Sequence, residues 1–593
     1  MVRAILVLCA AAIGASGASA KVEIGATVGK FEFKDIRYVT RTLTDLGEAK
    51  AYVLVFSSTT CPVAQRYIPK INELARAYSD QGVRFAIVNA SPGDTIQQMA
   101  YHALEYKIDV PVVKDLDGGV VEAIGATRTP EAALISANGT LLYRGRIDDQ
   151  YRVSGQQPNL LHDDLKAALD ATLAGKPIEA AETPVEGCEI TFPATPKPAG
   201  PVTFAKDVAP ILQKNCMPCH HEGEATPFAL STYEQASAKA DMIAQVVDEG
   251  RMPPWYAHPD FGTWANARTL TASDRRTIVQ WIEGGKQTGD LAAIPAPPDF
   301  PTSKWIIGEP DLLLTEEDTY ELPASGVIDY VYVTLPYQFP EDTWVQRIQV
   351  QPSNPKVVHH ANALYTVPPA GYQDDKSFLT GRVPGGSPAI VDNGVAFLIP
   401  KGAVITVQVH YVTTGKPETN RISVGFQYAK ETVCKQLRHK LLSARGFTIP
   451  PGHPAAPVSK STAFEENSTV LGLFIHMHLR GKNSTFTAQF PDGKLETLLV
   501  VPNYSFDWQL AYVYPHDSLK KLPAGTTLEC ASQFDNSAFN PFNPDPTKAI
   551  EHGPQTFDEM MDGYVFYTLD NENLNIQVDP KTGQEIVKTA DAR

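Results

Sequence analysis

Tyr52-Val-Leu-Val-Phe56 is an uninterrupted apolar run, and Cys61 follows shortly after it. A run of about four to eight such residues is typical of a strand buried on both faces. Ala64–Tyr78 then carries apolar residues at helical spacing, and Val83–Val88 is a second strand-like run. Strands that alternate with helices predict an α/β domain. We place this domain over residues 21–192, with Cys61 between a buried strand and the start of a helix.

Two further features fit the same fold. Asn138-Gly139 stands between Ala-Leu-Ile and Leu-Leu-Tyr, which predicts a hairpin. Arg128-Thr129-Pro130 follows the first strands and helix in the chain. The order strand, Cys, helix, followed later by this Pro, resembles the thioredoxin-like redoxins. The resemblance implies that Pro130 is in the cis form and faces the Cys61 thiol.

The surroundings of Cys61 depart from that family. Pro-Val-Ala follows Cys61, so the dithiol C-x-x-C is missing, and Leu54 and Ser58 stand where a peroxiredoxin has Pro and Thr. A thiol at a helix N-terminus still has a lowered pKa, because the helix end favours the thiolate. Cys188 could resolve a reaction of Cys61 or pair with it structurally. The alternative is a redoxin domain without thiol chemistry that serves for docking.

Cys216-Met-Pro-Cys-His220 has the C-x-x-C-H spacing that attaches a c-type haem. Cys216 and Cys219 would capture the porphyrin vinyl groups, and His220 would bind the iron as the proximal ligand. The alternative is a redox or zinc C-x-x-C pair, which leaves His220 unexplained. The sequence therefore predicts heme c as a cofactor.

Linkers rich in Pro and Ala, at Pro193–Pro201 and Ala292–Pro301, bound a short segment at residues 202–290. Together with the haem motif, its helical patterns resemble an all-α class I cytochrome c domain. The expected helices are Phe204–Gln213, Ser231–Glu249 and Thr271–Gly285.

That resemblance implies a Met ligand on a downstream loop, and Met252-Pro253 fits the pattern. A Met opposite the proximal His raises the iron potential, which suits electron transfer. We therefore expect a relay that an external electron donor reduces. Met242 lies in a helical run and is expected in the core, and His221 and His258 are alternative ligands.

The third part of the chain carries His residues on strand-like segments. Apolar and polar residues alternate along Val404–Tyr411, and His410 shares the polar face. His359 and His360 are adjacent on another such segment. Adjacent strand residues point to opposite sides, so these two can bind one metal ion only if the backbone bulges there.

A pair of His residues shares one face of the segment Leu471–Arg480. His476 and His478 stand at positions i and i+2, while the apolar residues of the segment take the opposite face. Two imidazoles placed in this way can bind one metal ion. Imidazole together with a Met thioether is a sensible ligand set for copper.

These motifs resemble the copper type II monooxygenases, the family of peptidylglycine α-hydroxylating and dopamine β-monooxygenase. The resemblance implies an all-β pair of jelly-roll-like sandwiches at residues 303–430 and 431–575, with a tail at 576–593. Each sandwich would hold one of two copper ions across a solvent cleft. The ligands that it implies are His359, His360 and His410 for one copper, and His476, His478 and Met560 for the other.

In that family the three-His copper stores an electron, and the other copper activates O₂ and hydroxylates a C–H bond of a small-molecule substrate. Tyr564 is kept four residues after Met560 and is a candidate catalytic residue. Phe474 replaces an Arg that grips a peptide carboxylate, and Asp562 replaces an Asn. A C-terminal peptide glycine is therefore not the expected substrate.

The cysteines of this region also depart from the family. Met561 stands where the family has a Cys, which leaves Cys530 without its usual partner. Cys434 is a candidate replacement for a disulfide, but the sequence does not establish the pairing.

The N-terminus predicts export. Arg3, the apolar run Ala4–Ile13 and Ala18-Ser-Ala20 have the order of a signal peptide, which we place at residues 1–20. The mature protein would be periplasmic or secreted, in a compartment that permits disulfides.

Charge and hydropathy limit the partners. The net charge is −16, and no block of Lys and Arg interrupts it, which argues against nucleic acid and anionic membrane as partners. No later segment approaches 18 apolar residues, so no membrane span is expected.

The leading interpretation is a multidomain, exported copper monooxygenase that hydroxylates a C–H bond with O₂ and receives electrons from its own haem. One alternative is a non-enzymatic haem and copper protein for electron transfer or binding. Another is a thiol-disulfide oxidoreductase or peroxidase that works through Cys61. Metal content and thiol trapping discriminate among the three.

Overall fold

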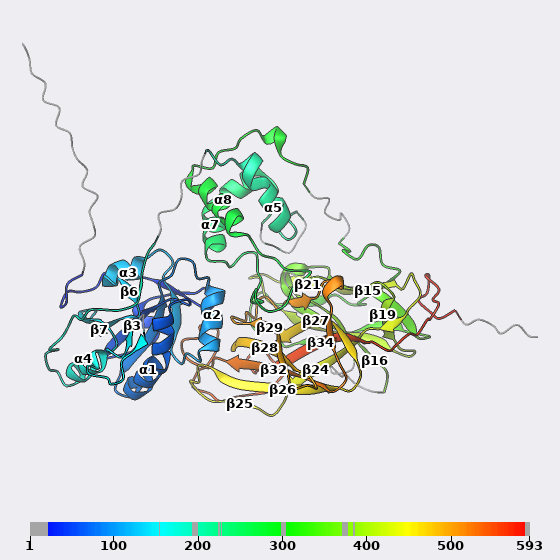
Figure 1. Ribbon diagram of the computed structural model, residues 1–593. Helices are drawn as coiled ribbons and strands as arrows, with labels where there is room; N and C mark the ends of the chain where they lie inside the picture. The colour runs from blue at the N-terminus through cyan, green and yellow to red at the C-terminus, as the bar shows by residue number, and fades with distance from the viewer. Residues whose placement is uncertain are drawn as a thin grey trace, which may run out of the picture. The chain divides into compact units, whose positions relative to one another are not determined.

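The computed structural model describes residues 22–586 except 153–154, 193–199, 223–225, 227, 298–303, 370–376 and 384–385 (Figure 1). The predicted signal peptide lies outside the described residues, as do most of Pro193–Pro201 and the end of Ala292–Pro301. The chain forms two compact units. One contains residues up to Asp94 and Tyr106–Pro193, and the other contains Thr95–Glu105 and everything from Ala194 onward.

The first unit is built on a seven-stranded sheet in the order β2-β1-β5-β4-β3-β7-β8. Its strands are β1 (Phe33–Asp35), β2 (Thr40–Arg41), β3 (Ala51–Ser57), β4 (Val83–Asn89), β5 (Val112–Lys114), β7 (Glu131–Ser136) and β8 (Leu141–Gly145). The helices of this unit are α1 (Pro62–Ser79), α3 (Gly119–Ile124) and α4 (Asp164–Leu173), whereas α2 (Ile96–Glu105) belongs to the second unit. The shorter elements are η1 (Leu43–Leu46), β6 (Arg128–Thr129), β9 (Tyr151–Arg152), β10 (Gly155–Gln156) and β11 (Cys188–Glu189).

The central strand β3 and helix α1 explain the position of Cys61. Every residue of β3 is buried, and the strand pairs parallel with β4 and antiparallel with β7. Cys61 is the N-cap of α1, and Pro62 takes the first helical position, where its missing N–H costs nothing. The hairpin at Gly139 and the cis bond before Pro130 are both present. The predicted α/β arrangement is therefore confirmed.

The helices within residues 204–293 pack around Trp281, whose ring lies 5.5 Å from that of Phe204. All three expected helical segments contain helix. The elements are the π-helical turn η2 (Phe204–Val208), α5 (Ala209–Asn215), α6 (Tyr233–Ala238), α7 (Ala240–Asp248), α8 (Ala272–Glu283) and the short turn η3 (Leu291–Ala293).

Two details of this segment differ from expectation. The helix expected over Ser231–Glu249 is broken at Lys239, whose φ of −113° and ψ of 11° end α6 before α7 begins. Met242 was expected in the core and is 49% exposed, so that prediction is wrong. The buried residues of α7 stand on another face of the helix, at Ala240, Ile243 and Val247.

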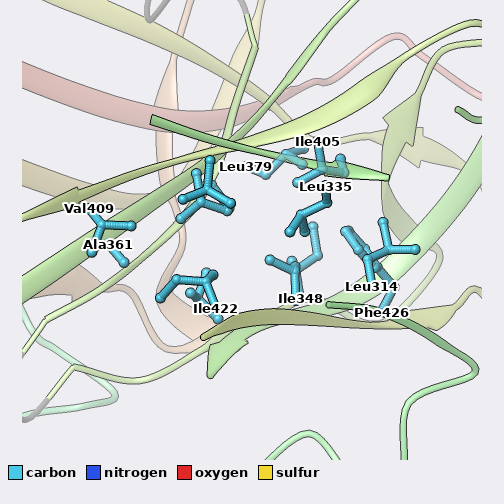
Figure 2. Packing of buried hydrophobic residues seen from close by; sticks show 14 of the residues in the cluster. Leu314, Leu335, Ile348, Ala361, Leu379, Ile405, Val409, Ile422 and Phe426 are labelled. Carbon is cyan, nitrogen blue, oxygen red and sulfur yellow. The ribbon is translucent and has the colours of Figure 1, made fainter. Parts of the chain in front are cut away.

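The first β-sandwich packs a four-stranded sheet, β14-β20-β16-β17, against a six-stranded sheet, β12-β22-β15-β19-β23 with β18 beside β15. Ile405, Val407 and Val409 of β20 are fully buried, as their alternation predicts. Figure 2 shows Ile405 facing Ile348 and Phe426 of the opposite sheet. The elements are β12 (Leu312–Thr315), β13 (Tyr320–Leu322), β14 (Val331–Gln338), β15 (Thr343–Pro352), η4 (Pro355–Val357), β16 (Val358–Thr366), β17 (Phe378–Arg382), β18 (Ala389–Ile390), β19 (Val395–Ile399), β20 (Val404–Tyr411), β21 (Glu418–Asn420), β22 (Ile422–Tyr428) and β23 (Lys435–Gln436).

The second β-sandwich packs β24-β34-β27-β30, with β31 beside β27, against β26-β32-β28-β29. The sheets approach closely at Gly563, where a Cβ would lie 2.8 Å from Cys530 Sγ and from the Phe486 ring. The C-terminal region is therefore all-β. Its elements are β24 (Arg438–Ala444), β25 (Thr448–Ile449), β26 (Ala456–Phe464), β27 (Ser468–His476), β28 (Gly481–Gln489), β29 (Leu495–Val501), β30 (Ala511–Val513), η5 (His516–Ser518), β31 (Lys520–Leu522), β32 (Thr526–Phe534), β33 (Ile550–Glu551) and β34 (Met561–Leu569).

The segment between α7 and α8 packs on this second sandwich. The Trp255 ring lies 5.2 Å from that of Tyr512, and the Trp264 ring lies 4.7 Å from that of Tyr514. The backbone N–H of Ala265 donates to the carbonyl of Val513 at 2.8 Å. The chain that follows the candidate haem ligand Met252 therefore reaches the edge strand β30.

Residues 576–586, the described part of the predicted tail, contact the first sandwich. Val578 packs with Trp344, and the Trp344 N–H donates to the carbonyl of Gly583. Cys434 and Cys530 are separate free thiols. Cys530 is buried inside the second sandwich, whereas Cys434 directly precedes β23, which pairs with β19 of the first. In the part of the chain that the structure describes, no helix has the length and apolar character needed to cross a bilayer.

Candidate functional sites

The first candidate site is a pair of thiols in the first unit. Cys61 is 1% exposed, and its Sγ lies 3.2 Å from the carbonyl oxygen of Thr129, directly before cis-Pro130. The implied contact of the thiol with the cis-Pro loop is therefore present. Two segments that are 68 residues apart in the sequence build this pocket.

Cys188 completes the pair. Strand β11 pairs antiparallel with β6 and sets Cys188 opposite Thr129. The Cys188 Sγ–H donates to Cys61 Sγ at 2.9 Å. This approach requires Gly187, whose φ is 153° and where a Cβ would lie 1.9 Å from the Thr129 carbonyl oxygen. Gly187 was not among the residues predicted from the sequence, although its position directly before a candidate partner Cys was a visible signal.

The two thiols have different pKa values. Burial raises the pKa of Cys61, but hydrogen bonds from Cys188 and Thr129 outweigh it and leave the pKa below its ordinary value. Burial, and then the interaction with Cys61, raise the pKa of Cys188 to about 11. Cys61 is therefore suited to attack a disulfide, and Cys188 is suited to follow as the resolving thiol.

The second candidate site is a cluster of three imidazoles in the first sandwich. One nitrogen from each of His359, His360 and His410 lies within 4.8 Å of the others. The register of β16 against β20 shifts between Val358 and His360, so the backbone bulge that adjacent ligands require is present. The geometry permits all three side chains to bind one ion.

Two nitrogens of this cluster, and one of His478 in the second sandwich, have no hydrogen-bond partner within the described residues. His360 Nε2, His410 Nδ1 and His478 Nε2 are all buried in this condition. Burial, and next the neighbouring imidazoles, lower the pKa of His410 to about 4 and that of His360 well below its ordinary value. A buried polar nitrogen without a hydrogen-bond partner costs free energy. Because a neutral imidazole nitrogen can bind a metal ion, a bound ion would remove this cost.

The third candidate site lies at the end of β27 in the second sandwich, where His476 is the last residue of the strand and His478 follows it. His476 Nδ1–H donates to Gln509 Oε1 at 2.7 Å, and His478 Nδ1–H donates to the carbonyl of Asp558 at 3.2 Å. Each contact leaves Nε2 for a metal ion and fixes the orientation of the ring. Gln509 was not predicted from the sequence, because no local pattern connects it to His476.

Glu559 joins this His pair to the segment that carries Met560. Its carboxylate accepts the backbone N–H groups of His478 at 2.9 Å and Arg480 at 2.7 Å. His476 pairs with Asp562 across the strands β27 and β34. Met560 is half-buried and directly follows Glu559, so its backbone is one residue away from a contact with His478.

The two histidine sets lie close to each other. The rings of His360 and His476 are 6.2 Å apart. Phe506 stacks on His359 at 4.9 Å and lies 6.2 Å from His478. The prediction of a solvent cleft between the two histidine sets is therefore wrong at these rings. The outer faces of the two sandwiches meet here, and Phe506 packs between the two sets.

The candidate catalytic Tyr564 lies beside this site. It pairs with Phe474 across β34 and β27, with ring centroids 5.7 Å apart. Both residues are on the same sheet face as His476. The surface next to the second histidine set is therefore aromatic, as the replacement of Arg by Phe474 predicts.

The haem motif directly follows α5, and Cys216 is the C-cap of that helix. His220 N–H donates to the carbonyl of Cys216, so Cys216, Cys219 and His220 share one helical turn. His220 Nδ1 lies 3.0 Å from the carbonyl of Phe228, which leaves Nε2 for iron. The alternative ligand His221 contacts the carbonyl of Met217 through Nδ1.

Two more candidate ligands follow downstream. Met252 is half-buried and precedes a cis bond to Pro253. The backbone N–H of His258, the other alternative ligand, donates to the carbonyl of Val500 in β29, so this residue is fixed on the second sandwich. The residues of the haem motif fit the group that the sequence implies.

Comparisons with known proteins cover the first unit. The AhpC/TSA family matches residues 24–144. The thiol-disulfide oxidoreductase ResA of Geobacillus thermodenitrificans is 31% identical over 118 residues, which are 20% of this chain and 66% of that protein. ResA of Halalkalibacterium halodurans is 31% identical over 113 residues, which are 19% of this chain and 62% of that protein.

Among solved structures, a hypothetical protein from Sinorhizobium meliloti 1021 matches 29% of this chain and 97% of its own, with 27% identity and a TM-score of 0.27. The chain spans just under two thirds of the length of the curated relatives that it matches. Cys61 lies inside the family match, and Cys188 lies beyond it. Residues 24–144 form a thioredoxin-like redoxin domain, within a multidomain chain whose C-terminal region is all-β.

Proposed function

We propose that the first unit is a thiol-disulfide oxidoreductase that uses Cys61 and Cys188. The 2.9 Å approach of the two sulfur atoms carries this proposal. The Cys61 thiolate attacks a substrate disulfide and releases one thiol, and a mixed disulfide forms. Cys188 then attacks Cys61 Sγ, releases the second thiol and leaves a Cys61–Cys188 disulfide. The similarity to the ResA proteins supports the same chemistry.

Trapping with oxidised glutathione tests this proposal. In the reduced Cys188→Ser variant, a mixed disulfide with glutathione should accumulate at Cys61, and mass spectrometry of the Cys61 peptide would detect it. The unaltered protein should instead form the internal disulfide and release both glutathione thiols. Equal labelling of Cys61→Ser and Cys188→Ser would contradict the proposal and favour a docking role.

We also propose that the C-terminal sandwiches bind two copper ions and form a monooxygenase. The buried, unsatisfied nitrogens of His360, His410 and His478 carry this second proposal. His359, His360 and His410 would hold one copper, and His476, His478 and Met560 the other. Bound copper would supply one-electron chemistry with O₂. The overall reaction converts R–H, O₂, two electrons and two protons into R–OH and water.

The protein's own residues organise this reaction. Gln509 and the carbonyl of Asp558 orient His476 and His478, and Phe506 packs between His359 and His478. Phe474 and Tyr564 form the wall against which a substrate would lie. These contacts support an oxygenase over a protein that only binds metal, because metal binding alone requires no aromatic surface beside one ligand set.

The electrons would come from a c-type haem attached to Cys216 and Cys219, with His220 and Met252 as iron ligands and an external donor. The contact of the segment after Met252 with β30 supports a relay toward the second sandwich. The sequence of residues 1–20 supports an exported protein, since haem attachment and disulfides both suit that compartment.

Metal analysis and haem oxidation test the oxygenase proposal. Two coppers per haem are expected in the purified, loaded protein. Reduced haem should reoxidise faster in O₂ when copper is present, and the His476→Ala variant should lose that acceleration. Copper binding without any effect on haem oxidation would favour a non-enzymatic binding protein, and absence of copper would exclude both readings.

A further inference from the structure

Access to the Cys61 thiol is blocked in this structure. Cys61 is 1% exposed, and Cys188 Sγ lies 2.9 Å from Cys61 Sγ. A substrate disulfide must bring one sulfur to about 2.0 Å from Cys61 Sγ, because that is the length of the bond that forms. Cys188 occupies this approach. It belongs to the segment Gly187–Phe192, which we call the cover segment, and this segment must move before Cys61 can attack a substrate.

Short backbone contacts hold the cover segment in place. Its strand β11 is two residues long and pairs with β6 in a sheet of two strands. Beyond β11, the Ile190 N–H donates to the carbonyl of Thr127 at 2.9 Å. The Phe192 ring packs on Gly118, where a Cβ would lie 3.2 Å from the ring. A two-stranded ladder of this length is a weak attachment, and segments held in this way open locally at low free energy.

Arg128 of β6 adds two side-chain bonds to this attachment, one on each side of Cys188. Its Nη1 donates to the carbonyl of Gly187 at 2.9 Å, and its Nη2 donates to Glu189 Oε1 at 2.9 Å. The Glu189 side chain is 72% exposed, so the ion pair lies in water. Loss of such a pair changes an opening equilibrium by about two- to fivefold. Arg128 therefore stabilises the closed position of the cover segment without locking it.

We propose that the cover segment alternates between an open and a closed position, and that Arg128 sets the balance between them. In the open position, the Cys61 thiolate attacks the substrate disulfide and releases one thiol. In the closed position, Cys188 attacks Cys61 Sγ of the mixed disulfide, the second thiol leaves and the Cys61–Cys188 disulfide forms. The same segment thus shields Cys61 and delivers the resolving thiol. This inference concerns the regulation of the proposed thiol-disulfide oxidoreductase and rests on that function.

The two steps should respond in opposite directions when Arg128 is replaced. The free dithiol protein is closed, so Arg128→Leu raises the open fraction and speeds the attack of Cys61 on a substrate. In the mixed disulfide the bound thiol keeps the cover segment away, so the same substitution makes the closed position rarer and slows resolution by Cys188. A general loss of stability would not speed one step and slow the other.

Oxidised glutathione, followed by acid quenching and mass spectrometry, measures both steps. In the Cys188→Ser background, addition of Arg128→Leu should speed formation of the Cys61–glutathione disulfide about two- to fivefold. In the chain with both thiols, Arg128→Leu should slow conversion of the mixed disulfide to the internal disulfide by a similar factor. Glu189→Gln removes the ion pair but leaves the bond to Gly187, so it should give smaller changes of the same signs.

The matched control is Arg76→Leu, which removes an exposed ion pair with Asp109 in the last turn of α1 and should leave both rates unchanged. Unchanged rates in Arg128→Leu, or a change of both steps in one direction, would overturn the proposal. Alkylation of Cys61 by iodoacetamide reports the opening without disulfide exchange and should also rise in Arg128→Leu. If alkylation rises but no glutathione adduct forms at Cys61, the oxidoreductase fails and the cover segment stands.

Discussion

Glu559 accepts the backbone N–H of His478, with Oε2 2.9 Å from the nitrogen. The same carboxylate accepts the Arg480 N–H, and it is fully buried. One acidic side chain therefore fixes the turn after His478 against the segment that carries Met560. This contact couples the ligands of one proposed copper site, although 81 residues separate His478 from Glu559.

Substitution of Glu559 should disable one copper site and spare the other. In Glu559→Gln the amide oxygen can accept one backbone N–H, but the amide NH₂ group then faces the second N–H, which is left without an acceptor. Each buried unsatisfied group costs about 1–3 kcal/mol. We expect copper to fall from two ions to one per chain, with a lower Tm. Copper analysis and thermal unfolding check this result.

The control for that experiment is Glu551→Gln, which changes an exposed carboxylate of β33 in the same way. It should keep two coppers and an unchanged Tm. Retention of both coppers in Glu559→Gln would show that Glu559 does not organise the site.

The orientation of His476 should depend on Gln509. Loss of an outer hydrogen bond to a ligand typically costs roughly 10–100-fold in metal affinity. We expect Gln509→Leu to weaken the second copper by that factor and to leave the three-His copper unchanged. Competition with a copper chelator measures both affinities. Gln489→Leu, at an exposed position on β28, is the matched control and should behave as the unaltered protein.

The two thiols should ionise in separate pH ranges. The pKa of Cys61 lies below its ordinary value and that of Cys188 is about 11, so Cys61 forms its thiolate first as pH rises. Alkylation of the reduced protein, followed by mass spectrometry of each peptide, should give a lower midpoint pH for Cys61. In Cys188→Ala the Cys61 midpoint should shift upward, because the donor to its sulfur is lost while burial remains. Coincident midpoints in the unaltered protein would contradict this assignment.

The close approach of the thiols should depend on Gly187. A Cβ at this position would lie 1.9 Å from the Thr129 carbonyl oxygen, so Gly187→Ala must displace β11 from β6. We expect slower formation of the Cys61–Cys188 disulfide, measured by quenched alkylation after addition of oxidised glutathione. Gly155→Ala is a matched control, since Gly155 has a φ of 159° with open space around it. Equal rates in both variants would indicate that the geometry at Gly187 is not required.

Local sequence patterns predicted the elements that carry the sites. The apolar run at β3 and the helical spacing of α1 set Cys61 at a helix start. The alternation in β20 set Ile405 inward and His410 on the other face, because the side-chain period of a strand is two. The adjacent pair His359-His360 required a bulge, and the register shift in β16 supplies one.

Predictions from local patterns were wrong where the spacing of apolar residues permits more than one buried helix face. The helix expected over Ser231–Glu249 is interrupted at Lys239, and Met242 faces solvent. A helical spacing of apolar residues leaves more than one choice of buried face, and packing against Trp281 and its neighbours decides among them. The supposed Cys434–Cys530 pair failed for a related reason, since the two residues belong to different sandwiches.

By itself, the sequence determined which residue types share a strand face or a helical turn, because those relationships depend on backbone periods within one segment. It determined the haem motif, the placement of Cys61 and the pairing of His476 with His478 on one face. Only the tertiary structure brought Cys188 to Cys61, Gln509 to His476 and Phe506 to His359. Those contacts join segments that are 33 to 147 residues apart, and their distances depend on how whole sheets pack, which no local period encodes.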